Sequence, residues 1–179
     1  MSDFIPRLTK NGMLNNKYWY SATNPFYASG YGLPNCTCYA WGRFWEISGI
    51  IPHLPTYDGG QWWDNVNGYE KGNTPQLGAV MCFNQPGGSG HVCIVEEILQ
   101  NGDVISSNSG YSRNPGGYDD PQYFWTETNP VNTGYRSTWE ISGGYQFQGF
   151  IYNPEQPIPP TPPSTSRKMP IWMYLKKYF

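Results

Sequence analysis

The chain has 179 residues, a length that suits one domain of ordinary size. Its 11 Lys and Arg and 13 Asp and Glu give a formal charge of −2, so no basic excess supports nucleic-acid binding through phosphates. Aromatic residues make up 17% of the chain, which argues against disorder, while 21 Gly and 17 Pro predict many turns and short strands. No run of 18 apolar residues occurs, so a membrane-spanning helix is not expected.

A helix is predicted over residues 36–47, CTCYAWGRFWEI. Asn35 is a good N-cap, because its side chain can accept hydrogen bonds from the free N–H groups of the first turn. Cys36, Ala40 and Ile47 fall along one side of this helix, as expected for a helix that packs on a sheet. Arg43 is expected to have a structural role, in an ion pair or near the helix end.

Strands are predicted after the helix. The pair Asn101-Gly102 is a strong signal for a two-residue hairpin turn, which would join two of these strands. The candidate strands are short stretches rich in apolar or aromatic residues, at 79–83, 91–98, 103–107 and 145–152. A helix followed by mostly antiparallel strands predicts an α+β fold, in a single domain over residues 1–153.

The composition changes sharply near residue 153. Residues 154–163 contain six prolines and predict an extended linker, which Ser and Thr residues continue to residue 166. Residues 167–179 carry four of the 11 basic residues, among aromatic side chains. This tail suits a docking strip for a partner protein or a disordered terminus, and it also suits an anionic membrane surface.

Cys36 is the strongest candidate nucleophile among the four cysteines. It would lie in the first helical turn, where free N–H groups and the helix dipole favour an anion and lower the pKa of a thiol. The same N–H groups could hold the oxyanion of a tetrahedral intermediate. Cys38 lies about 200° further around the helix and cannot share this role. Cys82 and Cys93 fall in strands and are interpreted as small apolar core residues.

Only two histidines are present, which limits the choice of a general base. His91 opens a strand directly after the glycine-rich run 86–90, where a substrate can approach, whereas His53 lies in a loop between prolines. Asn108 is predicted to share a face of the sheet with His91 and to orient it. In a flat two-residue hairpin, however, Asn108 would pair with Val95, roughly 13 Å from the histidine. Strand coiling, a bulge or a shifted register must close that gap, and a turn role for Asn108 is the alternative.

Two further sets of residues are weighed in the same way. A zinc site is the main rival to the nucleophile hypothesis, although its C-x-C and H-x-C spacings are tighter than those of usual zinc sites; its ligands would be Cys36, Cys38, His91 and Cys93. Several aromatic residues are candidates for stacking on a sugar or peptide, with core packing as the alternative; these are Tyr31, Trp62, Trp63 and Tyr111. No metal or organic cofactor is expected.

Four segments of the chain occur together in an informative order. They are NCTCYAWGR at 35–43, NTPQLGAVMCF at 73–83, GHVCIVEEI at 90–98 and VISSNSGY at 104–111. They resemble the helix with the Cys, the Pro-x-x-Gly-Ala segment, the Gly-His-Val strand and the third-residue segment of CHAP-domain peptidoglycan hydrolases. The similarity extends over residues 24–152.

This resemblance implies a papain-like α+β fold in which an N-terminal helix carries the Cys. It also implies cleavage of an amide bond in bacterial peptidoglycan, by an N-acetylmuramoyl-L-alanine amidase or a peptide endopeptidase. By position, Cys36 matches the nucleophile, His91 the base and Asn108 the third residue, where many relatives have Glu. Cys38 stands where the family commonly has Trp. The loop at 21–34 has no acid, so the calcium site of some relatives is not expected.

The resemblance also suggests a biological setting. The first twelve residues lack the apolar stretch of a secretory signal, so no signal peptide is expected. A phage lysin fits this pattern. Such a protein is expected to be a monomer made in the host cytoplasm, which reaches the wall through a holin or on a virion. Its tail is expected to contact the wall, the membrane or a virion protein. The alternatives are a non-catalytic wall- or glycan-binding module and a structural zinc domain of a virion protein.

Overall fold

Helix α2 (Cys36–Ser48) begins at the predicted residue. The side chain of Asn35 caps it, accepting a hydrogen bond from the Cys38 N–H at 2.9 Å. The helix ends at Gly49, whose φ of 70° is left-handed, a conformation that glycine adopts without the strain of a side chain. The prediction of a capped helix over 36–47 is therefore confirmed, with one more residue at its end.

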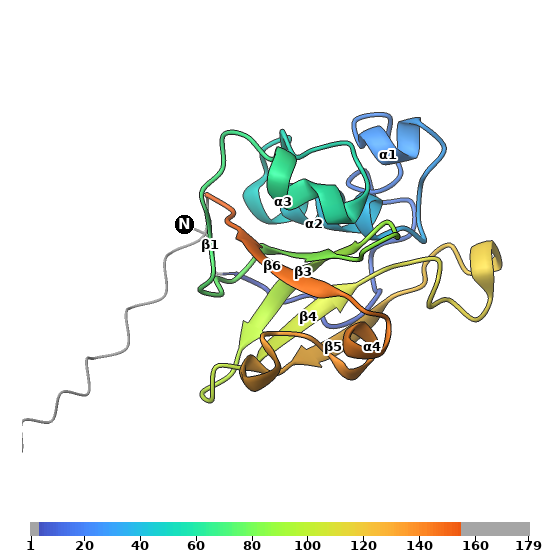
Figure 1. Ribbon diagram of the computed structural model, residues 1–179. Helices are drawn as coiled ribbons and strands as arrows, with labels where there is room; N and C mark the ends of the chain where they lie inside the picture. Colours follow the sequence, from blue (N-terminus) through green and yellow to red (C-terminus); the bar gives the residue numbers. More distant parts are fainter. Residues whose placement is uncertain (1–3, 155–179) are drawn as a thin grey trace, which may run out of the picture.

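A computed structural model describes residues 4–154 of the chain (Figure 1). The predicted linker beyond Pro154 and the tail at 167–179 lie outside the described residues. Three short helices accompany α2: α1 (Pro25–Ala28), α3 (Trp62–Asn65) and α4 (Thr138–Ser142). Three 3₁₀ turns occur as well, at η1 (Gly59–Gln61), η2 (Gly117–Asp119) and η3 (Val131–Thr133). No helix within residues 4–154 has the length and apolar character needed to cross a membrane.

Six strands form one sheet in which every pair of neighbours is antiparallel. Its order is β1-β6-β2-β3-β4-β5. The strands are β1 (Lys71–Gly72), β2 (Val80–Asn84), β3 (His91–Ile98), β4 (Val104–Asn108), β5 (Trp125–Asn129) and β6 (Gln146–Ile151). The α+β prediction is confirmed. The predicted strand at 91–98 has the observed bounds, and the other three are displaced by one residue or shortened. No strand was specified at β5 and no helix at α4.

The sheet has a hydrophobic cluster on each face. Helices α1, α2 and α3 cover one face (Figure 1), and the cluster on that face includes Val80, Val92 and Ile94. The other face carries Met81, Cys93 and Val95, with Trp139 of α4 packed against them. This alternation along β2 and β3 is what a sheet buried on both sides requires, since successive side chains point to opposite faces. We call these the helix face and the α4 face.

The β3–β4 hairpin differs from the predicted one in two ways. Leu99 donates its N–H to the carbonyl of Asp103 at 2.8 Å, which leaves a loop of three residues, not two, between the strands. The register then shifts again between Val95 and Glu97, a bulge that takes Glu96 out of the pairing. Val95 consequently pairs with Ser106 and not with Asn108 as predicted, and β4 is displaced by two residues toward the start of β3.

Candidate active site

His91 lies at the first position of β3, where the chain enters the sheet through a tight passage. Gly90 has a φ of 68°, and a side chain there would collide with the backbone of Gly60 in η1. Gly60 in turn donates its N–H to the carbonyl of Ser89 at 2.8 Å. Glycine is needed at this close approach, and the approach fixes the start of β3 and with it the position of the imidazole.

Asn108 lies at the end of β4 and meets His91 directly. The Nε2 atom of His91 and the Oδ1 atom of Asn108 are 2.9 Å apart, a normal hydrogen-bond distance, and both residues are buried. The displaced register of the hairpin closes the gap of roughly 13 Å expected for a flat ribbon. This contact leaves Nδ1 as the ring nitrogen that Asn108 does not engage.

Cys36 approaches the same strand from the helix face. Its sulfur is within hydrogen-bonding reach of the backbone N–H of Val92, the residue after His91, and of the N–H groups of Thr37 and of Cys36 itself. Among the described residues the thiol and the imidazole form no direct hydrogen bond. The structure therefore brings His91 and Asn108 into contact and puts the Cys36 sulfur beside the neighbouring peptide unit of β3.

The pKa shifts at this site differ from the expectation for a helix N-terminus. Burial raises the pKa of the Cys36 thiol to about 11, while the N–H groups of Val92 and Thr37 lower it by less, and Asp58 raises it further. The expectation of a lowered thiol pKa is thus wrong for the resting protein, because loss of water outweighs the helix N–H groups. Burial likewise lowers the pKa of His91, with the Asn108 hydrogen bond opposing the shift. Both groups are therefore neutral at pH 7.

Aromatic side chains surround the imidazole. Trp125 stacks on it at a centroid distance of 6.0 Å, and Trp139 meets it edge-on at 5.4 Å. The ring centroid of Tyr145 lies 6.4 Å from that of the imidazole. Burial, and then the nearby Cys36, raise the pKa of the Tyr145 hydroxyl. The guanidinium of Arg113 lies over Trp125 at 4.8 Å. Sequence reasoning missed these four residues, because they come from β5, α4 and loops far from His91 in the chain.

The four aromatic residues predicted to bind substrate have different surroundings. Trp62 is fully buried, stacks on Phe26 and donates its indole N–H to the Tyr57 carbonyl at 3.0 Å, so the prediction that it lines a groove is wrong. Trp63 is half-buried against the helix-face cluster. Tyr31 and Tyr111 are exposed, at 66% and 49%, and their contact with substrate stays a prediction.

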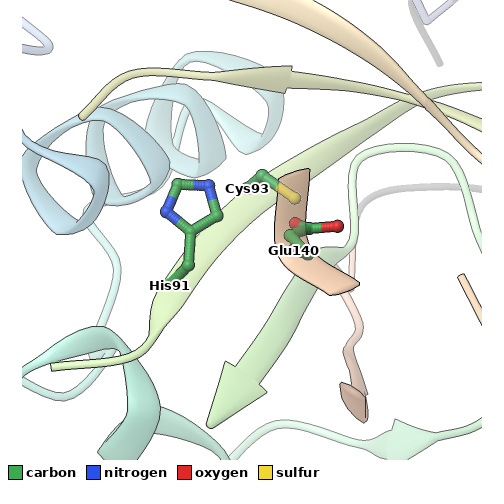
Figure 2. Close-up of side chains that lie close together, drawn as sticks. All are labelled: His91, Cys93 and Glu140. Atoms are coloured by element: carbon green, nitrogen blue, oxygen red, sulfur yellow. The ribbon is translucent and has the colours of Figure 1, made fainter. Parts of the chain in front are cut away.

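The rival zinc set does not assemble among the described residues. The sulfur of Cys38 is buried, 4.0 Å from the Trp19 carbonyl, and belongs to no cluster with His91. A different group of possible ligands, His91, Cys93 and Glu140, has ligand atoms within 4.8 Å of one another on the α4 face (Figure 2). Asn108 already holds Nε2 of His91 there, so a metal ion on that nitrogen would have to displace the hydrogen bond.

Comparison with known proteins relates part of the chain to a protein family. Residues 26–110 match the family model of the CHAP domain, and this segment contains Cys36, His91 and Asn108. Residues 26–110 are thus similar to the CHAP domain. The α+β architecture, with the helix that carries Cys36 packed on the antiparallel sheet, is the papain-like fold expected for such a domain.

Two proteins of Staphylococcus aureus show how far the similarity extends. The staphylococcal secretory antigen ssaA2 is 35% identical over 100 residues, a match that covers 54% of this chain and 34% of the antigen. The chain thus spans about a third of the length of the curated relatives it matches. The crystal structure of an N-acetylmuramoyl-L-alanine amidase overlays with a TM-score of 0.46 and 20% identity, covering 65% of this chain and 30% of that one.

Proposed function

We propose that the chain is a peptidoglycan hydrolase that cleaves an amide bond with Cys36 as nucleophile, His91 as base and Asn108 as the residue that orients His91. The observation that carries this proposal is the 2.9 Å contact between Nε2 of His91 and Oδ1 of Asn108, inside the segment that is similar to the CHAP domain. It leaves Nδ1 to serve a thiol at the start of α2. Peptidoglycan is the substrate that the family resemblance implies.

In the first half-reaction the thiol attacks the amide carbonyl. The proton on the Cys36 sulfur moves to Nδ1 of His91 as the sulfur–carbon bond forms, and the carbonyl oxygen becomes an oxyanion. The N–H groups in the first turn of α2 can stabilise this oxyanion, because they have no partner within the helix. The carbon–nitrogen bond then breaks, the amine leaves with the proton from Nδ1, and a thioester remains on Cys36.

In the second half-reaction water hydrolyses the thioester. Nδ1 accepts a proton from the water as its oxygen attacks, and the released thiolate of Cys36 takes that proton back. The products are an amine and a carboxylic acid. Because burial raises the pKa of Cys36 to about 11 and lowers that of His91, the resting pair is a neutral thiol and a neutral imidazole. Proton transfer accordingly accompanies the attack on the carbonyl.

The proposal is tested with purified protein and isolated bacterial cell walls. Wild type should clear the turbidity of the suspension, and Cys36→Ser should lose at least about 1,000-fold in rate. Cys82→Ala is the matched control, because it removes a buried cysteine from the helix-face cluster and leaves Cys36 and His91 in place. Mass spectra of the fragments then distinguish cleavage at the muramoyl–alanine bond from cleavage within the peptide.

Two outcomes would contradict the proposal. Clearance by Cys36→Ser at the wild-type rate would remove Cys36 from the mechanism. Wall binding by both proteins with no released fragments would instead support the non-catalytic binding module. The phage setting and the route to the wall stay predictions from the sequence resemblance.

A further inference from the structure

A chain of buried hydrogen bonds continues from His91 across the α4 face. Asn108, which contacts His91, donates its amide Nδ2 to the hydroxyl of Ser106 at 3.1 Å. Ser106 donates to Oδ1 of Asn129 at 2.7 Å, and Asn129 donates Nδ2 to Oε2 of Glu140 at 3.1 Å. All four residues beyond the histidine are fully buried. They come from β4, β5 and α4, so three elements must pack correctly to complete the chain.

The carboxyl group of Glu140 determines which groups donate and which accept along this series of hydrogen bonds. Its Oε2 also accepts the backbone N–H of Ser137 at 2.8 Å, as part of the capping box at the start of α4. An oxygen that accepts two N–H groups must face the amide nitrogen of Asn129, which turns Oδ1 of Asn129 toward Ser106. The single hydroxyl proton of Ser106 then goes to that oxygen, since 2.7 Å is its shortest contact.

The same pattern of donors and acceptors determines which imidazole nitrogen of His91 carries the proton. With its proton committed to Asn129, Ser106 can only accept from Asn108, so the Nδ2 group of Asn108 faces Ser106 and Oδ1 faces His91. An amide oxygen accepts and never donates, so the His91 nitrogen opposite it, Nε2, must carry a proton. In a neutral imidazole the lone pair is then on Nδ1, the nitrogen needed for the thiol.

We propose that Glu140, Asn129 and Ser106 form a positioning relay that fixes the tautomer of His91 through Asn108. This proposal rests on the proposed function for the role of His91 as a base, but the tautomer itself does not depend on catalysis. Ser106, Asn129 and Glu140 are positioning residues, because they act on His91 only through Asn108. The relay explains why three polar side chains are buried on a face where the neighbouring side chains are apolar.

The test compares two neighbouring serines of β4. Ser106→Ala removes the acceptor for Asn108 Nδ2, so the amide can turn and the Nδ1–H tautomer of His91 should become populated. Ser107→Ala is the matched control: Ser107 is equally buried, but it points to the helix face, where it donates to Glu96 at 2.6 Å. The ring ¹⁵N shifts of His91 are measured by NMR at about pH 8, where the imidazole is neutral, and wall hydrolysis is measured in parallel.

We expect the Nε2–H tautomer in wild type and Ser107→Ala, and a mixture of tautomers in Ser106→Ala. The kcat of Ser106→Ala should fall by about 10- to 100-fold, with KM changed by less than about threefold. An unchanged tautomer together with an unchanged kcat in Ser106→Ala would overturn the relay. If wild type releases no wall fragments but the tautomer changes as described, the proposed function fails and the relay is retained.

A pair of variants keeps the test decisive if Ser106→Ala does not fold. Glu140→Gln keeps an amide oxygen that can accept from both Ser137 and Asn129, so we expect it to retain the wild-type tautomer and most of kcat. Glu140→Leu removes that acceptor and frees the amide of Asn129 to turn, so we expect a mixture of tautomers and a lower kcat. The wild-type tautomer and kcat in a folded Glu140→Leu protein would count against the relay.

Discussion

The two faces of the sheet carry buried polar networks of opposite character. On the helix face, Arg43 of α2 binds Glu96 of β3 through two hydrogen bonds, at 3.0 and 2.8 Å, and Ser107 donates to the same carboxylate at 2.6 Å. On the α4 face the network runs through neutral groups, from His91 to the single carboxyl of Glu140, with no cation among the bonded side chains.

This difference separates a structural network from a network that can change its state. Arg43 and Glu96 compensate each other's charge, and the bulge in β3 at Glu96 lets the pair tie α2 to the sheet. Glu140 has no such partner: burial raises its pKa to about 7, and its Oε1 has no hydrogen bond among the described residues. The α4 face therefore holds a carboxyl group that can change its protonation state near neutral pH.

The largest expected effect comes from breaking the helix-face pair. Glu96→Ala removes the fully buried counter-charge of the Arg43 guanidinium and leaves only the partly exposed Glu46, at 2.8 Å, which should lower the free energy of unfolding by about 3 kcal/mol. Urea denaturation measures this loss. The double variant Arg43→Met/Glu96→Leu is the control, since it removes both charges and should lose less than Glu96→Ala alone. A loss below about 1 kcal/mol for Glu96→Ala would show that the pair behaves like an exposed one.

The next effect concerns Glu140 and the pH dependence of stability. Its pKa is about 7 in the folded protein and 4.5 for the free side chain, so the folded state binds more protons between these values. Stability contributed by this group is therefore present below pH 4.5 and lost as the pH rises toward 7. Relative to wild type, Glu140→Gln should gain about 2 kcal/mol between pH 5 and pH 8.

Urea titrations of both proteins at the two pH values measure this gain. His91 has a lowered pKa and contributes the opposite slope, since its stability is lost as the pH falls below 6.5, but it does so in both proteins and cancels in the difference. A difference that stays constant from pH 5 to pH 8 would mean that Glu140 is already ionised in the folded protein at pH 5.

The sequence predicted the elements of the site better than the register between its strands. Local rules located α2 through its Asn35 cap and β3 through its apolar run, and alternation put His91 and Asn108 on one face. The register could not be predicted, because the bulge at Glu96 depends on its pairing with Arg43, 53 residues away. No local propensity encodes such a contact.

The missed α4 had a local signal. Ser137 and Glu140 have the spacing of a capping box, and both halves of that box form in the structure. A search for this motif would have predicted the short helix. The packing of Trp125 and Trp139 around His91 had no comparable signal, since it depends on where β5 and α4 dock on the sheet.

Cys36 packs against the helix-face cluster, and its reactivity tests whether the resting thiol is neutral. With a pKa of about 11, the thiol should react slowly with iodoacetamide at pH 7, and the rate should rise about tenfold per pH unit up to pH 10. Cys36→Ser is the control, because the other three cysteines are fully buried. Fast alkylation that does not change between pH 6 and pH 8 would instead indicate a thiolate–imidazolium pair and contradict the neutral resting state.

The smallest expected effect is the position of the acid limb of activity. The proposed mechanism needs a neutral imidazole, and burial lowers the pKa of His91, so half of the maximal kcat/KM should persist to a pH below 6.5. The Asn108 hydrogen bond opposes that shift, because it also favours the protonated ring. Replacing it through Asn108→Leu should therefore move the acid limb further down while lowering the maximal rate. An upward movement would mean that Asn108 disfavours the imidazolium, and the orientation argued for its amide would then be reversed.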